Sequence, residues 1–107
     1  MKKLQPSMRE STRYLKFKIH SEEKIEISEI VETFWEASCS YMGVKELSDA
    51  KPWLIGNKFD EEKQEGVIRV KREYADDIRA SLILINKISD EKVMLSVDNV
   101  SGNLDNL

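Results

Sequence analysis

The fold is decided by the stretch KPWLIGNKFD EEKQEGVIRV KREY, which covers residues 51–74. Aromatic and branched residues dominate its first part, and such residues favour a pleated, half-buried strand. This strand is expected to begin near Pro52, because proline has no N–H to donate to a neighbouring strand. Residues 60–66 are polar and end in glycine, which is typical of a hairpin loop. The stretch therefore predicts two antiparallel strands, 51–59 and 67–72.

The second strand of this hairpin has two chemically different faces. Ile68 and Val70 alternate with Arg69 and Lys71, and alternate residues of a strand point to opposite faces of a sheet. One face of the strand is therefore expected to cover an apolar core, whereas the other carries positive charge.

The segments outside the hairpin predict two more strands and two helices. Residues 14–20 alternate between apolar and polar side chains, and residues 93–97 repeat this pattern near the end of the chain. Apolar residues recur at helical spacing in residues 27–42 and in residues 74–88.

The first helix has recognisable ends and an aromatic interior. Ser28 is a candidate N-cap, because its hydroxyl can accept a hydrogen bond from an otherwise unpaired backbone N–H of the first turn. Gly43 is the residue at which we expect the helix to end. We expect two of its aromatic residues, Phe34 and Trp35, in the core. For Tyr41, and for Trp53 of the hairpin, a core position is favoured over an interface with a partner.

The element order is β-α-β-β-α-β, the split βαβ arrangement of ferredoxin-like and RNA-recognition-like domains. We therefore predict an α+β sandwich, with two helices on one face of a four-stranded antiparallel sheet whose first and third strands are central neighbours. The core would contain the strand residues Leu15, Phe17, Ile19, Ile68 and Val70. The other face would present four cations side by side, Lys16, Lys18, Arg69 and Lys71. With no carboxylate expected beside them, these cations indicate a surface for a phosphate backbone.

A chain of 107 residues is long enough for one domain. We divide it into a basic arm (1–12), a single α+β domain (13–102) and a short polar tail (103–107). The net charge of −3 is unevenly distributed, because residues 1–20 and 51–72 are net positive and the remainder is net negative. Such a polarised molecule can steer a polyanion to one of its faces.

The sequence offers little for catalysis. His20 is the only histidine and is expected at the surface, so that a histidine pair cannot cleave RNA here. Cys39, the only cysteine, cannot form an internal disulfide and has no neighbouring histidine, which fits a reducing compartment. There is no CxxC motif, no HExxH motif and no glycine-rich phosphate loop. We therefore predict no catalytic residue, no metal site and no bound cofactor in this chain.

Two further expectations concern location and RNA contact. No apolar run approaches the roughly 20 residues of a membrane span, and no secretion signal is evident, so we expect a cytoplasmic protein without a membrane partner. RNA-recognition domains stack bases on aromatic residues of the third strand. Residues 66–72 contain none, so we expect contact with the RNA backbone rather than base stacking.

Short motifs follow one another along nearly the whole chain: LQPSMR (4–9) followed by Arg13 and Tyr14, VETFWEA (31–37), KPW (51–53), FD (59–60), GVIR (66–69), Arg72, IRASL (78–82) and VSG (100–102). Together they resemble the motifs of the archaeal ribonuclease P protein component 2 family. Their order and spacing, rather than any one of them, carry the resemblance. The chain departs from the family pattern at its end, where NLDNL replaces the basic tail that family members often have.

The resemblance implies an accessory subunit of a ribonucleoprotein with an RNA-recognition-like fold. In that family the RNA carries the catalysis with Mg²⁺ and removes the 5′ leader of precursor tRNA. The implied partners are the ribonuclease P RNA, protein component 3, the other protein subunits and, indirectly, precursor tRNA, with self-association inside a heterotetramer. Matched positions imply RNA contacts by Arg9, Arg13, Arg69 and Arg72, beside the cations Lys16, Lys18 and Lys71 inferred from the strand pattern.

Two other functions remain open on the sequence. The chain would serve as a ferredoxin-like protein-interaction or regulatory domain if it acts without RNA. An independent nuclease is the third alternative, and the lack of catalytic groups argues against it.

Overall fold

The computed structural model describes residues 11–107, so the expected contact of Arg9 lies outside the described residues. In chain order the elements are β1 (Thr12–His20), α1 (Ile27–Met42), α2 (Val44–Ala50), β2 (Trp53–Leu54), β3 (Glu65–Lys71), α3 (Ala75–Leu84), β4 (Lys87–Ile88), β5 (Glu91–Lys92) and β6 (Met94–Ser101).

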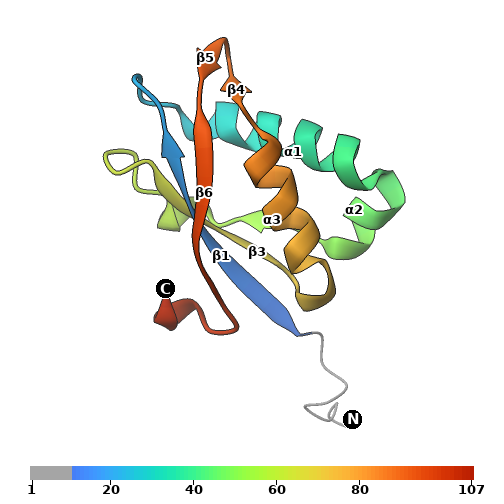
Figure 1. Cartoon of the computed structure of the whole chain (residues 1–107). Helices are drawn as coiled ribbons and strands as arrows, with labels where there is room; N and C mark the ends of the chain where they lie inside the picture. The colour runs from blue at the N-terminus through green and yellow to red at the C-terminus, as the bar shows by residue number, and fades with distance from the viewer. Residues whose placement is uncertain (1–10) are drawn as a thin grey trace, which may run out of the picture.

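Four of the strands form one antiparallel sheet in the order β2-β3-β1-β6. The helices lie together on one side of this sheet (Figure 1). The predicted α+β, ferredoxin-like fold is confirmed, including the central position of the first and third strands. Two elements were not predicted: the helix α2 and the small hairpin β4–β5.

The predicted strand core is confirmed. Leu15 and Phe17 of β1 are fully buried, and Leu15 lies opposite the buried Ile68 of β3. The helices close this layer with side chains that include Phe34 of α1 and Leu82 of α3, both inaccessible to solvent. The face of the sheet turned away from the helices, here called the open face, is therefore the one that carries the strand cations.

The first hairpin strand is much shorter than predicted. β2 contains only two residues, because a 3₁₀ turn at Gly56–Lys58 interrupts the extended backbone. The arms of the hairpin remain joined by the Ile55 N–H, which donates to Val67 O at 2.9 Å, and by a bridge between Asp60 and Glu65. The hairpin was predicted correctly, but the strand over residues 51–59 was not.

The ends of the helices also differ from prediction. α1 has the predicted bounds, but its N-cap is Glu26 rather than Ser28 and makes no side-chain cap hydrogen bond. Gly43 ends the helix as predicted, with a φ of 88° and its N–H donating to Cys39 O at 2.8 Å. α3 ends at Leu84 instead of residue 88, because the backbone becomes extended at Ile85.

A buried glutamine fastens the β2–β3 hairpin to the segment before α1. The side-chain oxygen of Gln64 accepts the Ile25 N–H at 2.8 Å, and its amide nitrogen donates to the carbonyls of Ile25 (3.2 Å) and Glu61 (2.8 Å). Its backbone carbonyl accepts the Ile19 N–H at 2.8 Å. These bonds satisfy polar groups that burial would otherwise leave unpaired.

Three aromatic side chains expected in the core are exposed instead. Trp53 is 60% exposed, Tyr41 49% and Trp35 41%, whereas Phe34 is buried as predicted. Trp53 is exposed because it lies opposite Arg69 in the sheet, on the open face. Its neighbour Leu54 takes the core side.

No helix in the described part of the chain is long and apolar enough to cross a membrane.

Candidate nucleic-acid interface

The strand register determines how the predicted cations are arranged on the open face. Lys16 lies opposite Val67, and Lys18 lies opposite Glu65. Arg69 lies opposite Tyr14. Lys16, Lys18, Arg69 and Lys71 thus share this face as predicted, but each lies opposite an uncharged or acidic residue of the neighbouring strand rather than opposite another cation.

A carboxylate lies among these cations, contrary to expectation. Glu65 is on the same face, and its Oε1 is 3.9 Å from Nζ of Lys16. Both side chains are partly exposed, and such surface pairs contribute about 0–1 kcal/mol. Glu65 therefore reduces the positive potential around Lys16 and Lys18 more than it stabilises the fold.

The C-terminal tail, residues 103–107, covers part of the open face. Leu104 and Leu107 line a hollow of about 230 Å³ together with Lys16 and Val67. Asn99 of β6 donates its side-chain amide to the carbonyl of Asn106 at 3.3 Å. Val67 is only 6% exposed, although it points away from the helices. In Figure 1 the tail lies across the sheet from the helices.

The remaining predicted cations gather where β1 begins and β3 ends. Arg69 is exposed on the open face, and Arg72 is exposed in the 3₁₀ turn that follows β3. The Arg72 N–H donates to Ser11 O at 2.9 Å, which brings the two chain segments together. Arg13 is half-buried there, and its Nη1 donates to Thr12 O at 2.9 Å. We call Arg13, Arg69, Lys71 and Arg72 the cationic end of the sheet.

Negative charge borders this end on the helical side. The pKa of Tyr74, two residues after Arg72, is raised above its ordinary value, chiefly by desolvation and then by the carboxylates of Glu46 and Asp49. A polyanion approaching from the open face meets Arg69 and Lys71, whereas Arg13, paired with the buried Val70, lies on the helical face. A polyanion approaching from α2 meets these carboxylates.

The lone histidine is at the surface, as predicted. His20 Nε2 lies 3.0 Å from Ser96 Oγ, and that hydroxyl donates to Asp98 Oδ1 at 3.0 Å. Because the hydroxyl proton is directed at Asp98, the imidazole is not placed to remove it, as nucleophilic catalysis would require. Within residues 11–107, no group of three or more His, Cys, Asp or Glu side chains is arranged to hold a metal ion.

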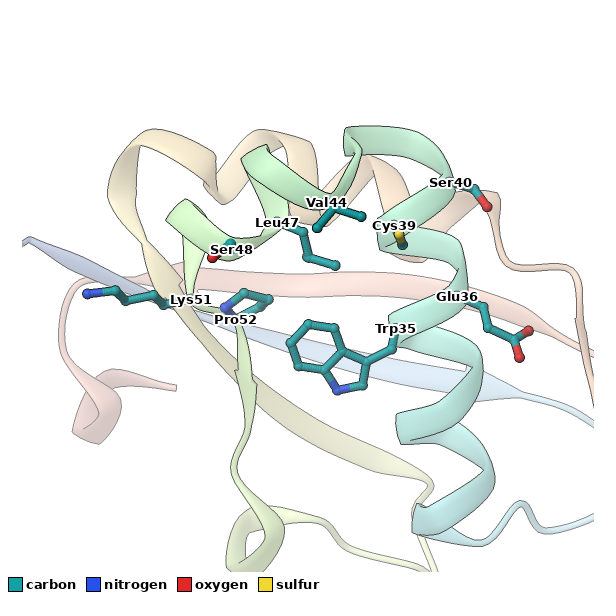
Figure 2. A pocket seen from close by; sticks show the side chains of 9 residues that line it. All are labelled: Trp35, Glu36, Cys39, Ser40, Val44, Leu47, Ser48, Lys51 and Pro52. Carbon is teal, nitrogen blue, oxygen red and sulfur yellow. The ribbon is translucent and has the colours of Figure 1, made fainter.

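A separate apolar groove of about 880 Å³ lies in the helical layer. In Figure 2, Trp35 of α1, Val44 and Leu47 of α2, and Pro52 before β2 point toward the same space. Cys39 also lines the groove, while Glu36 points away along α1 (Figure 2). Val44 is 74% exposed, so this groove displays apolar surface on the helical side of the molecule.

The helical layer on one side and the partly cationic sheet face on the other define a small ferredoxin-like α+β domain. A family model matches residues 13–107. The chain belongs to the Rpp14/Pop5 family.

Curated relatives cover nearly the whole chain. Ribonuclease P protein component 2 of Pyrococcus furiosus is 40% identical over 106 residues, which is 99% of this chain and 87% of that protein. The protein of the same name from Thermococcus gammatolerans is 37% identical over the same shares. That of Methanocaldococcus jannaschii is 35% identical over 104 residues, 97% of this chain and 75% of that protein. The family resemblance seen in the sequence is confirmed.

A solved structure supports the fold. A chain in the cryo-EM structure of yeast ribonuclease MRP superposes with a TM-score of 0.72 and 15% identity, over 91% of this chain and 78% of that one. At this identity the match concerns the arrangement of elements alone.

Proposed function

We propose that this chain is an accessory protein subunit of ribonuclease P and supports removal of the 5′ leader from precursor tRNA. The observation that carries the proposal is its nearly full-length similarity to proteins named ribonuclease P protein component 2. In such an assembly the RNA, with Mg²⁺, performs the cleavage in the cytoplasm. This chain binds that RNA and other protein subunits, and it contacts precursor tRNA only indirectly.

The cationic end of the sheet supports a role in binding RNA. Arg69 and Arg72 are exposed there, and the carboxylates of Glu46 and Asp49 border this end from the helical side. Because phosphate contacts dominate protein–RNA affinity, we assign the RNA backbone to this end. The part of the open face around Lys16 and Lys18 contributes less to RNA binding, because Glu65 is paired with Lys16 and the tail lines the hollow beside it.

The apolar groove between α1 and α2 is the surface we assign to protein component 3. Acidic residues of α1, including Glu32 and Glu36, are exposed, which disfavours RNA and favours a protein segment with an apolar anchor and basic flanks. Val44→Gln is expected to weaken binding of component 3, because Val44 is exposed apolar surface in the groove. The neighbouring exposed Lys45, which does not line the groove, provides the matched control Lys45→Gln.

Reconstitution by omission tests the function. Cognate ribonuclease P RNA is assembled with the other protein subunits, and 5′ cleavage of precursor tRNA is measured with and without this chain at moderate Mg²⁺. The proposal requires a large rate loss on omission. An unchanged rate, with the RNA and the other subunits shown to be competent, would overturn it.

The groove also favours a second candidate, a protein-interaction domain without RNA function. Such a domain would bind its partner through Trp35 and Val44 and would purify without RNA. Its function would be insensitive to salt, whereas RNA binding weakens steeply as salt rises.

A further inference from the structure

A row of three side chains crosses the open face from the sheet edge to its centre. Trp53 of β2 lies opposite Arg69 of β3, and Arg69 lies opposite Tyr14 of β1. Directly paired residues in antiparallel strands project to the same face. The next residues confirm the orientation, because the paired Leu54, Ile68 and Leu15 turn inward toward the helices.

The spacing of the row suits two separate aromatic platforms. Neighbouring strands are about 4.8 Å apart, so Trp53 and Tyr14, two strands apart, are separated by roughly 10 Å at the backbone. That distance is too large for both rings to cover the same base, and it leaves Arg69 between them. The row is therefore an alternation of aromatic, cationic and aromatic groups.

Trp53, Arg69 and the partly exposed Tyr14 do not line the hollow that the C-terminal tail forms on the open face. The tail residues Leu104 and Leu107 lie beside Lys16 and Val67, which form the next pair on the open face. Trp53 is 60% exposed, and Arg69 is also exposed. Because β2 is only two residues long, the open face can be reached across this edge of the sheet.

We propose that this row binds two unpaired nucleotides of RNA, one base stacked on Trp53 and the other on Tyr14, with Arg69 contacting a phosphate between them. The inference rests on the proposed function and specifies its ligand: single-stranded rather than duplex RNA. Sequence-tolerant binding of single strands combines aromatic platforms with cations that follow the backbone. In a duplex the bases are stacked on one another and do not present their faces to the rings.

Charge favours RNA over a protein as the occupant of this row. Arg69 is part of the row, and Arg72 lies at the end toward which β3 runs. Among the residue pairs of β1 and β3 on the open face, the nearest carboxylate is Glu65, which is paired with Lys18, two open-face pairs away from Arg69. A protein ligand would need an acidic segment, whereas RNA supplies both phosphates and flat apolar surfaces.

The proposal departs from the expectation that bases do not stack on this sheet. That expectation considered only the third strand, which indeed lacks aromatic residues. The rings come from the strands on either side of it. The alternation of Trp53 with the core residue Leu54 was the available sequence signal, because it directs Trp53 to the open face.

Fluorescence titration of the chain measures the proposed contact directly. In a Trp35→Phe background Trp53 is the only tryptophan, and a single-stranded oligouridylate is expected to quench tryptophan fluorescence saturably, while a duplex of equal length is not. Stacking contributes about 1–3 kcal/mol per base, so Trp53→Ala should weaken oligouridylate binding roughly 5- to 150-fold. Trp53→Phe should restore part of the loss, since it retains a ring.

Matched variants separate stacking from charge and from folding. Met94→Ala removes another exposed apolar side chain of the sheet, opposite His20, and should leave the affinity unchanged. Arg69→Ala should reduce the slope of affinity against salt concentration by the amount that corresponds to about one lost phosphate contact. Trp53→Ala should leave that slope unchanged. Retained far-UV dichroism confirms that each variant is folded.

Three results would overturn the inference. They are equal quenching by duplex and single strand, full affinity of the folded Trp53→Ala variant, and loss of component 3 binding in that variant with RNA affinity intact. The last would identify the row as a protein contact. If omission of the whole chain still abolishes 5′ cleavage, any of these results leaves the proposed function standing and removes only the stacking site.

Discussion

Gly66 of β3 lies directly opposite Phe17 of β1, and the phenyl ring occupies the space that a side chain at position 66 would need. A Cβ there would lie 2.8 Å from Cζ of Phe17 and 3.1 Å from Cδ1 of Phe59. Phe17 is fully buried, so its ring cannot move aside without disturbing the core. Close packing between these strands therefore depends on a glycine.

Gly66→Ala should lower the free energy of unfolding by about 1–3 kcal/mol, the usual cost of overpacking a core. Urea denaturation checks the value. Gly56→Ala is the control, because a Cβ at that position meets no atom within 4 Å. Equal destabilisation by the two substitutions would contradict the packing explanation. Phe17→Leu in the Gly66→Ala background should recover part of the loss if the ring is the obstacle.

Gln64→Ala should also destabilise the fold, but through hydrogen bonding. The substitution leaves the Ile25 N–H without its acceptor and the Ile25 carbonyl without its donor. Leaving such buried groups without a hydrogen-bond partner lowers the free energy of unfolding by about 1–3 kcal/mol. Thermal or urea unfolding measures the change, with the exposed neighbour Lys63→Ala as the control. Amide exchange at Ile25 should be faster in Gln64→Ala, and unaltered protection there would refute the anchoring role.

Two buried serines of the helical layer differ in whether their hydroxyl group is hydrogen-bonded. Ser38 of α1 is fully buried, and its Oγ has no hydrogen-bond partner among the described residues. Ser81 of α3 is equally buried, but its Oγ donates to Asp77 O at 2.9 Å. Ser38→Ala should therefore stabilise the chain by about 1 kcal/mol, since it removes an unsatisfied group and favours the helix.

Ser81→Ala is the matched comparison for Ser38→Ala. It loses a hydrogen bond that offsets its gain in helix propensity, so its net effect should be near zero. Paired melting temperatures give the ranking. A greater stabilisation from Ser81→Ala would mean that the Ser38 hydroxyl finds a partner in solution.

Local alternation in the sequence was sufficient to assign strand faces but not strand register. The pattern of residues 14–20 correctly places Leu15 and Phe17 inward and Lys16 outward. Which residue stands opposite Lys16 depends on how two distant segments align, and the strand pattern contains no information on this. The sequence therefore predicted a continuous row of cations, whereas the structure places Val67 and Glu65 opposite the two lysines.

The candidate site was predicted in part for the same reason. Arg69, Lys71 and Arg72 follow one another along one strand and its turn, so their proximity was evident. The contribution of Trp53 required the pairing of β2 with β3. The tail lacks an apolar period, and its position over Lys16 arises from the folded sheet rather than from its own sequence.

Removal of individual cations should distinguish the two ends of the open face. Arg69→Ala and Arg72→Ala are each expected to weaken binding to ribonuclease P RNA and to lower the salt dependence by about one phosphate contact. Lys16→Ala should change both quantities less, because Lys16 is paired with Glu65. Cleavage at low Mg²⁺ provides the functional readout. Unimpaired cleavage by a chain carrying both Arg69→Ala and Lys71→Ala would exclude the cationic end from RNA contact.

Deletion of residues 104–107 should make Lys16 available to RNA. The tail lines the hollow beside Lys16 and Val67, so its removal exposes this part of the sheet. The shortened chain should bind RNA with a salt slope larger by up to about one phosphate contact, and Lys16→Ala should then abolish the increase. In the full-length chain the same substitution should have little effect, and the difference between the two backgrounds is the quantity to measure. Equal effects of Lys16→Ala in both backgrounds would show that the tail does not screen this lysine from RNA.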